Sequence, residues 1–216
     1  TADIRHVVRH RWHPLEEQVE RDDDIPPALV QELRDKGYFG WSIPQAYGGL
    51  GLSTEELVLC AFELSQASVA LRARVGTNTG IGSEALVADG TEAQKQRWLP
   101  PLIAGEDKAC FGVTEPNAGL NTLKLTTRAV RDGDHYVVSG QKVWISTAQV
   151  ANKILLLART TPQEECQGTQ GLSLFYTDLD RSKVEVREIE KMGRKCVDSN
   201  QVFIDGLRIP VEDRIG

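Results

Sequence analysis

The sequence has few cysteines and no long apolar run. Its four cysteines are widely spaced and form no C-x-x-C pair, so the sequence predicts free thiols in a reducing compartment rather than a disulfide framework; they are Cys60, Cys110, Cys166 and Cys196. No stretch approaches the roughly 20 apolar residues that a membrane-spanning helix needs. Basic residues are outnumbered, 25 against 31 acidic ones, for a net charge of −6. This balance argues against nucleic-acid binding, because nothing would neutralise a run of phosphates.

The first half of the chain has the period of helices. Residues 3–20 form a mixed-charge amphipathic pattern, and Pro26-Pro27 opens a helix that ends at Gly37. Ser53-x-x-Glu56 is a capping box whose helix is expected to run to about Ser68. A second box, Thr91-x-x-Gln94, starts a helix that Pro100-Pro101 should end.

From Ala109 the apolar period changes to two. Seven short strands are predicted, at LKLTTRAVR, HYVVSG, KVWIS, KILLLAR, LSLFYTD, VEVREI and QVFIDG. Asp132-Gly133 predicts a hairpin turn between the first two strands. A helical segment followed by a run of strands indicates an α+β chain of two domains, 1–107 and 108–216.

Three histidines, His6, His10 and His13, share a helical face. A metal site is one interpretation, but no carboxylate or thiol completes the ligand set, so a solvated helix face is favoured and no metal is expected.

Two stretches of the second half combine residues suited to a large cofactor. In FGVTEPNAGLN at 111–121, an apolar strand opens into a loop whose Asn117-Ala118-Gly119 tip can adopt φ > 0 and point backbone N–H groups at a phosphate. In KVWIS, Trp144 and Ser146 stand two residues apart, so a β-period would turn both side chains to one face. A planar face and a hydroxyl beside an anion-binding loop suit a flavin dinucleotide.

These two stretches resemble the flavin-binding signatures of the acyl-CoA dehydrogenase family. Three more blocks agree in the same order, at 43–53 (IPQAYGGLGLS), 90–106 (GTEAQKQRWLPPLIAGE) and 191–210 (KMGRKCVDSNQVFIDGLRIP). The similarity covers nearly the whole chain. It departs at Leu120 and Asn121, where the family usually has Ser-Asp, and at Ser146, where it often has Thr.

The resemblance implies an N-terminal α-helical domain followed by a middle domain built as an antiparallel β-barrel or sandwich. The family's C-terminal four-helix bundle, which supplies the catalytic Glu, matches no part of residues 1–216, so no catalytic base is expected in this chain. The sequence starts without Met and stops at Gly216 directly after a well-formed block, and we expect both ends to be cuts.

The resemblance also implies a set of FAD-binding residues: Phe111, Val113, Thr114, Gly119, Leu120, Trp144, Ile145 and Ser146. The alternative for Trp144 is a core aromatic of a β-domain, the commoner fate of a strand tryptophan. Glu115 is interpreted as holding the shape of the loop rather than as a base. Leu120 keeps a backbone N–H but lacks the family's hydroxyl.

Residues 69–88 predict an unusual helix, because Gly76, Gly80 and Gly82 lie inside it at a cost of about 1 kcal/mol each. The resemblance implies that this helix lines the far end of the acyl pocket. Tight helix packing is an equally good explanation of the glycines. The predicted pocket face consists of Ala73, Gly76, Thr77 and Gly80, with Leu120 as a further substrate contact and Glu84 as the one acid near the pocket.

The activity implied is FAD-dependent α,β-dehydrogenation of an acyl-CoA to the 2-enoyl-CoA. Two alternatives stay open: a flavin-dependent oxidase or monooxygenase of the same fold, and a non-catalytic flavin- or CoA-binding scaffold. The expected partners are an acyl-CoA, an electron-transfer flavoprotein or similar acceptor, and further copies of the complete protein in a dimer or tetramer. The expected location is the bacterial cytoplasm or, in a eukaryote, the mitochondrial matrix.

Overall fold

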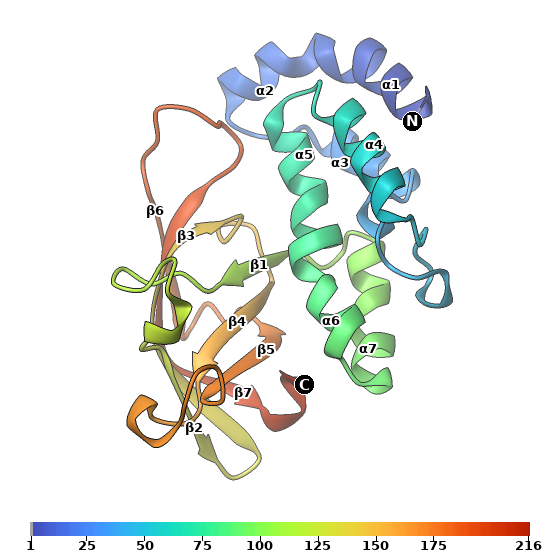
Figure 1. Ribbon diagram of the computed structural model, residues 1–216. Helices are drawn as coiled ribbons and strands as arrows, with labels where there is room; N and C mark the ends of the chain where they lie inside the picture. The colour runs from blue at the N-terminus through green and yellow to red at the C-terminus, as the bar shows by residue number, and fades with distance from the viewer. Residues whose placement is uncertain (1) are drawn as a thin grey trace.

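In the computed structural model, which describes residues 2–216, a helical half lies against a β-sheet half (Figure 1). The two classes of element follow one another along the chain as the sequence predicts. The α-helices are α1 (Ala2–Val7), α2 (Glu16–Asp22), α3 (Pro27–Asp35), α4 (Thr54–Leu64), α5 (Val69–Gly76), α6 (Glu84–Asp89) and α7 (Glu92–Ile103). The strands are β1 (Ala109–Gly112), β2 (Arg128–Asp132), β3 (His135–Ser146), β4 (Lys153–Arg159), β5 (Leu172–Asp178), β6 (Val184–Glu188), β7 (Ser199–Pro210) and β8 (Arg214–Ile215).

Helix starts are predicted better than helix ends. Both capping boxes are present, with Ser53 paired to Glu56 and Thr91 paired to Gln94. The predicted end near Ser68 is wrong, because α4 stops at Leu64. The predicted end at Pro100-Pro101 is also wrong, since α7 continues to Ile103. The prolines remove hydrogen bonds to the carbonyls of residues 96 and 97, and water can satisfy these because both residues are exposed.

Two helical stretches contain π-helical turns that the apolar pattern does not predict. The run over residues 3–20 divides into α1, a π turn at Val8–Trp12, a 3₁₀ turn at His13–Leu15 and α2. Pro14, which has no N–H to donate, lies in that 3₁₀ turn. The run over 69–88 divides into α5, a π turn at Thr77–Gly82 and α6.

The strands form one eight-stranded sheet in the order β6-β7-β3-β2-β4-β5-β8, with β1 beside β4. The sheet is not closed into a barrel, and it is not purely antiparallel, because β1 runs parallel to β4 and β2 meets β4 in parallel at a single pair of residues. The hairpin between β2 and β3 is confirmed. HYVVSG and KVWIS are one strand, β3, with irregular register after Val138 and after Lys142. The LKLTT part of the first predicted strand is not a strand.

A shared core joins the two halves. Side chains of α6 and α7, among them Leu86, Trp98 and Leu99, are buried in one apolar cluster with Leu155 of β4 and Tyr176 of β5. The connection between β6 and β7 reaches back across the junction, where the Cys196 backbone N–H donates to Asp23 Oδ1 at 2.6 Å. The helical half therefore holds the sheet at a fixed position.

Candidate functional site

The two signature stretches lie side by side although about 30 residues separate them. The backbone N–H of Val143 in β3 donates to the carbonyl oxygen of Thr114, just beyond β1, at 2.9 Å. The hydroxyl of Thr147, which directly follows β3, donates to the Ser146 carbonyl at 2.7 Å and lies 3.4 Å from the Ala109 carbonyl oxygen of β1. The fold thus brings Phe111, Val113 and Thr114 next to the Trp144–Ser146 segment.

A buried ion pair fixes this junction. Lys142 Nζ lies 2.9 Å from Glu115 Oε1 and also donates to the carbonyl of Leu157 at 2.8 Å. The carboxylate accepts from the backbone N–H groups of Thr126 and Thr127 at 2.6 and 2.9 Å. Burial raises the pKa of Glu115, but these hydrogen bonds and the Lys142 charge outweigh it and lower that pKa to about 2. Glu115 is an anion that holds the loop, which agrees with its interpretation from the sequence, whereas Lys142 was missed.

Trp144 has an unusual backbone and an exposed side chain. Its φ is 63°, in the left-handed region that costs a non-glycine residue about 1–2 kcal/mol, and its side chain is 63% exposed. The strand is irregular before this segment, because the register between β3 and β7 shifts between Lys142 and Ile145. Ile145 is buried and Ser146 is half-buried. A strained, exposed tryptophan beside a rigid ion pair is a mark of a binding surface rather than of a core.

The loop after β1 turns without the backbone conformation predicted for it. Glu115 and Ala118 exchange backbone hydrogen bonds at 3.0 and 3.2 Å. None of Asn117, Ala118 and Gly119 has a positive φ, so the expected left-handed tip is wrong. Gly119 has open space where a Cβ would lie, and the Leu120 side chain is fully exposed, at 105%.

Several donors around these stretches have no acceptor within residues 2–216. The backbone N–H groups of Val113 and Thr114 make no hydrogen bond there, nor do the hydroxyls of Thr114 and Ser146. Phe111 is 39% exposed beside them. Exposed aromatic faces next to free donors fit a planar heterocycle whose edge carries acceptors, as a flavin does.

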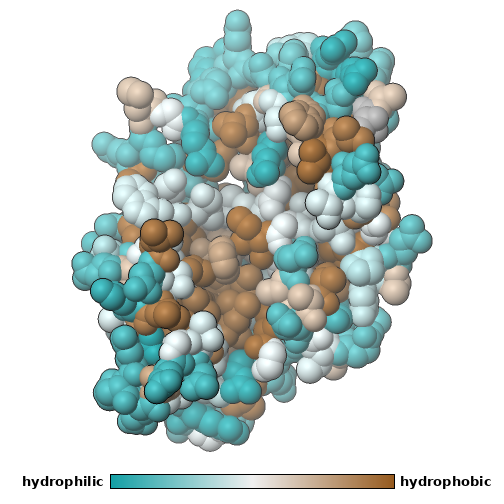
Figure 2. All heavy atoms as spheres, viewed as in Figure 1, coloured by the Kyte–Doolittle hydropathy of each residue, from teal (hydrophilic) through white to brown (hydrophobic). Residues whose placement is uncertain are grey.

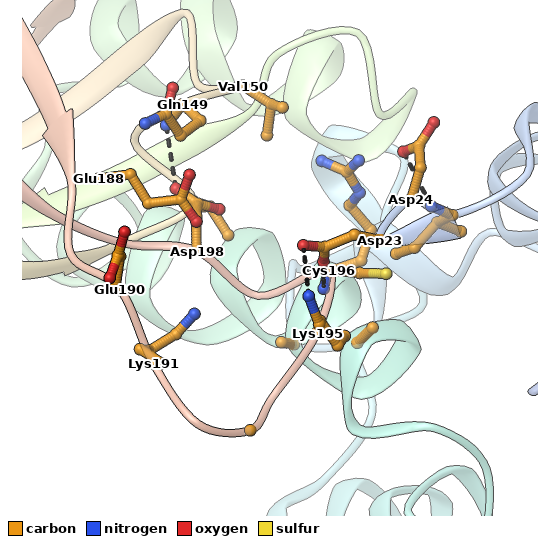
Figure 3. Close-up of a pocket in the computed structure, with 16 residues that line it drawn as sticks. Asp23, Asp24, Gln149, Val150, Glu188, Glu190, Lys191, Lys195, Cys196 and Asp198 are labelled. Atoms are coloured by element: carbon orange, nitrogen blue, oxygen red, sulfur yellow. Dashed lines mark hydrogen bonds and ion pairs between the residues drawn. The ribbon is translucent and has the colours of Figure 1, made fainter. Parts of the chain in front are cut away.

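A polar cavity of about 500 Å³ adjoins the end of β3, between the helical half and the sheet (Figure 3). Ala73 and Arg74 of α5 line it, together with Thr147, Asp23 and Asp198. The Nε of Arg74 is buried and has no hydrogen-bond partner within the described residues. Burial lowers the pKa of this guanidinium, and the charges of Asp24 and Asp198 oppose that effect.

The predicted pocket face of residues 73–84 is divided between two places. Gly76, Gly80 and Glu84 line a second cavity of about 200 Å³, between α4 and α5, whereas Ala73 lines the polar cavity. Thr77 lines neither of these two, and its hydroxyl donates to the Arg74 carbonyl at 3.3 Å. Gly76, Gly80 and Glu84 follow one another at a spacing of four and share one cavity, whereas Ala73 and Thr77 belong to a neighbouring row of the helix.

The glycines of this segment have different neighbours. A Cβ at Gly82 would lie 2.9 Å from the Ala109 Cβ, so Gly82 permits close packing of the helix on β1. A Cβ at Gly80 would meet nothing within 4 Å. Both explanations of the glycines are therefore supported, each at its own position. Arg72, which also lines the second cavity, was missed from the sequence because its pattern resembles any exposed helix residue.

The three histidines do not converge. The rings of His6 and His10 lie 4.7 Å apart, while the His13 ring contacts the Gln66 carbonyl. Within residues 2–216, no three His, Cys, Asp or Glu side chains are placed to hold a metal ion. No helix in that range is long and apolar enough to cross a membrane.

Comparison with known proteins shows to which protein family the chain belongs. The family model for the N-terminal domain of acyl-CoA dehydrogenase matches residues 1–106, and the model for the middle domain of acyl-CoA dehydrogenase matches residues 110–207. The chain belongs to the acyl-CoA dehydrogenase family. This confirms the resemblance and the helical-then-β architecture expected from it.

The relatives are longer than this chain. (2S)-methylsuccinyl-CoA dehydrogenase of Cereibacter sphaeroides is 37% identical over 216 residues, which cover 96% of this chain and 38% of the relative. Subunit CarC of the caffeyl-CoA reductase–Etf complex of Acetobacterium woodii is 29% identical, over 93% of this chain and 52% of the relative. A glutaryl-CoA dehydrogenase from Mycobacterium smegmatis, solved in complex with FADH2, superposes with a TM-score of 0.87 at 28% identity, covering 99% of this chain and 53% of its own. The chain spans about half the length of these proteins or less.

Proposed function

We propose that this chain is the helical and flavin-binding part of an FAD-dependent acyl-CoA dehydrogenase, with domains at 1–107 and 108–216. The observation that carries the proposal is the junction of β1 and β3, where Trp144 is exposed in a strained conformation beside free donors. Family membership and a structural relative that holds FADH2 support the cofactor. The names of the relatives support thioesters of coenzyme A as substrates, without agreeing on one acyl group.

The residues of the junction fit the cofactor. Trp144 and Phe111 would pack against the ring system, and the amides of Val113 and Thr114 would donate to its acceptor edge. Ser146 and the Thr114 hydroxyl supply two more donors. When bound, FAD supplies the acceptor for the hydride that leaves the β-carbon of the thioester. Because the Lys142–Glu115 pair fixes these donors beforehand, little reorganisation is needed as charge develops on the ring.

The loop after the first signature would face the phosphates of the cofactor. Gly119 allows close backbone approach, since it has no Cβ, and Leu120 and Ile145 would contribute through backbone groups. Because Leu120 has no hydroxyl, about one hydrogen bond to the cofactor is lost. This loss should weaken cofactor binding by roughly 0.5–1.5 kcal/mol. That loss is small for a cofactor with many contacts.

The acyl tail would extend toward α5, where Gly76 and Gly80 leave space and Ala73 and Thr77 lie close by. We place the catalytic base outside residues 1–216. Glu115 is committed to its ion pair with Lys142, and Glu84 lines the cavity proposed for the tail. Removal of an α-proton requires a carboxylate within hydrogen-bond reach of the reacting carbon.

We also propose an electron-transfer flavoprotein or a similar acceptor as partner and a homo-oligomer as the complete assembly. The relative CarC belongs to a complex that is named with an Etf. Apolar side chains gather in a hollow over the sheet at the centre of the view in Figure 2. A surface of this kind is typical of an interface with further polypeptide.

The test uses the full-length gene product that contains this chain. Trp144→Ala should lower FAD retention, measured by absorbance at 450 nm after gel filtration, while Val130→Ala, another exposed apolar residue of the sheet, should not. Under anaerobic conditions an acyl-CoA should bleach the flavin of the unchanged protein and yield the 2-enoyl-CoA. Rapid reoxidation by O₂ with peroxide release would indicate an oxidase instead. Retention of FAD by Trp144→Ala at the unchanged level would overturn the assignment of the flavin site.

A further inference from the structure

A fully buried asparagine of β7 bonds to the backbone between Trp144 and Ser146. The side chain of Asn200 is completely excluded from solvent, and its Nδ2 donates to the carbonyl oxygen of Ile145 at 2.8 Å. The pairing of β3 with β7 sets these two residues opposite each other. Asn200 therefore holds the one residue that stands between the exposed indole and the hydroxyl of the candidate flavin site.

Two neighbours fix the orientation of the Asn200 side chain. Its Nδ2 also donates to the carboxylate of Asp198, and its Oδ1 accepts from Gln149 Nε2 at 3.0 Å. The same carboxylate accepts from the backbone N–H of Gln149 at 3.0 Å (Figure 3). A flip of the amide would set its oxygen against the Ile145 carbonyl and the carboxylate, so only one orientation satisfies all three partners.

The left-handed backbone at Trp144 needs neighbours that enforce it, because such a conformation persists in a non-glycine residue only where its surroundings over-determine it. Regular pairing with β7 does not supply them, since the register shifts immediately before Ile145. On the N-terminal side, the Val143 N–H donates to the Thr114 carbonyl at 2.9 Å. Asn200 supplies the matching bond on the C-terminal side.

The bond to Asn200 also sets the direction of the next backbone N–H. The peptide that joins Ile145 to Ser146 is planar and trans, as no cis peptide bond occurs within residues 2–216. Its C=O and N–H therefore point in opposite directions. Because the carbonyl points at Asn200, the Ser146 N–H is turned away from that side chain. One buried amide thus orients both Trp144 and Ser146.

We propose that Asn200 is a positioning residue for the flavin, which holds Trp144 in its left-handed conformation and orients Ser146 beside it. The inference rests on the proposed function, because it takes this segment to bind FAD. Since Asn200 is fully buried, it acts through the Ile145 backbone and not by contact with the cofactor. Asp198 orients Asn200 in turn.

The first part of the experiment needs no cofactor. Urea unfolding of the FAD-free full-length gene product compares Trp144→Gly with Trp144→Ala, because their difference in stability reports the left-handed backbone. Trp144→Gly should be the more stable of the two where Asn200 is present. The difference should disappear when both changes are made in Asn200→Leu, because the segment is then free to adopt an extended backbone.

Gln94→Leu is the matched control for lost stability. Gln94 is buried, and its Nε2 likewise donates to two backbone carbonyls, those of Glu212 and Arg214. Its replacement should destabilise the protein, but the difference between Trp144→Gly and Trp144→Ala should remain.

The second part measures FAD binding and the reduction potential of the bound flavin with Trp144 intact. Asn200→Leu should raise the dissociation constant of FAD roughly tenfold, the order expected of one or two lost hydrogen bonds. It should also lower the reduction potential, because donors that stabilise the charge of the reduced ring are misplaced. Asp198→Ala should act in the same direction by less, while Gln94→Leu should leave the dissociation constant within about twofold.

The outcomes separate this inference from the proposed function. A difference between the two Trp144 variants that persists in Asn200→Leu, or FAD binding that Asn200→Leu does not weaken, would overturn the role of Asn200 and leave the flavin site intact. If Asn200→Leu does not fold, Asp198→Ala decides, and an unchanged dissociation constant there would overturn the role. Absence of FAD binding by the unchanged protein would overturn the proposed function, while the first part alone would still decide whether Asn200 holds Trp144.

Discussion

At the scale of single residues, the candidate site depends on residues held in an unfavourable backbone conformation or in an unfavourable buried charge state. Trp144 keeps a left-handed backbone, and Lys142 and Glu115 keep two opposite charges inside the protein. Each state persists only because neighbouring atoms enforce it. The sequence pattern could single out Trp144 as the proposed flavin contact through its resemblance to the family signature. It could not reveal the strain or the buried partner of Glu115, because both arise from segments that meet only in the fold.

The Lys142–Glu115 pair predicts how stability depends on pH. The folded-state pKa of Glu115, about 2, lies below its ordinary value of 4.5. Its contribution to the free energy of unfolding is therefore complete above about pH 4.5 and is lost as the pH falls toward 2. Glu115→Gln leaves Lys142 buried and unpaired, so it should cost about 3–5 kcal/mol at pH 7 in urea unfolding and make the dependence between pH 5 and 2.5 shallower. Glu165→Gln, at an exposed position, is the control; an equal loss in both variants would contradict the prediction.

The strain at Trp144 predicts opposite effects on stability and on cofactor binding. Glycine adopts φ near +63° without penalty, whereas alanine does not. In the cofactor-free protein, the free energy of unfolding of Trp144→Gly should therefore exceed that of Trp144→Ala by about 1 kcal/mol. Urea unfolding measures this difference. Both variants should lose FAD to the same extent, because both remove the ring. Equal stability of the two variants would show that the left-handed backbone relaxes in solution.

At the scale of elements, the segment from α5 to α6 combines packing and open space. The π turn at Thr77–Gly82 carries both properties within six residues. Gly82→Ala should destabilise the protein by about 1–3 kcal/mol, because its Cβ would come 2.8 Å from the Thr77 carbonyl oxygen and 2.9 Å from Ala109. Gly80→Ala should be neutral or stabilise by up to about 1 kcal/mol, since nothing lies within 4 Å. Thermal unfolding of the two variants checks this, and similar losses would contradict it.

The elements also show what a sequence can and cannot predict. Both capping boxes are local, each confined to four residues, and both are present. The merging of two predicted strands into β3 was missed, because continuity through the irregular register at Gly140 and Trp144 is enforced by pairing with β7. The parallel pairing of β1 with β4 depends on contacts across more than 40 residues. A spacing of three and four includes two adjacent rows of a helix, and it could not show that Ala73 and Thr77 lie on a different row from Gly76 and Gly80.

At the scale of the whole molecule, the two sequence-defined halves share one interior. Trp98, Leu99 and Leu102 of α7 are buried against Leu155 and Tyr176 of the sheet. Cutting the chain near 107 would expose this surface on both pieces. We therefore expect the two halves to depend on each other for stability, although the elements of secondary structure divide near residue 107.

This shared interior predicts that the chain unfolds as one unit. Leu99 is fully buried in the cluster between α7 and the sheet, so Leu99→Ala should cost about 2–5 kcal/mol through lost contacts and a residual cavity. The loss should appear equally in both halves: hydrogen exchange of amides in α4 and in β5 should accelerate by the same factor, and one urea transition should report both. Leu50→Ala, at an exposed position of the helical half, should change neither. If Leu99→Ala accelerated exchange in the helices and left β5 protected, the two halves would be separate folding units, and the sheet would hold the flavin junction without help from the helices.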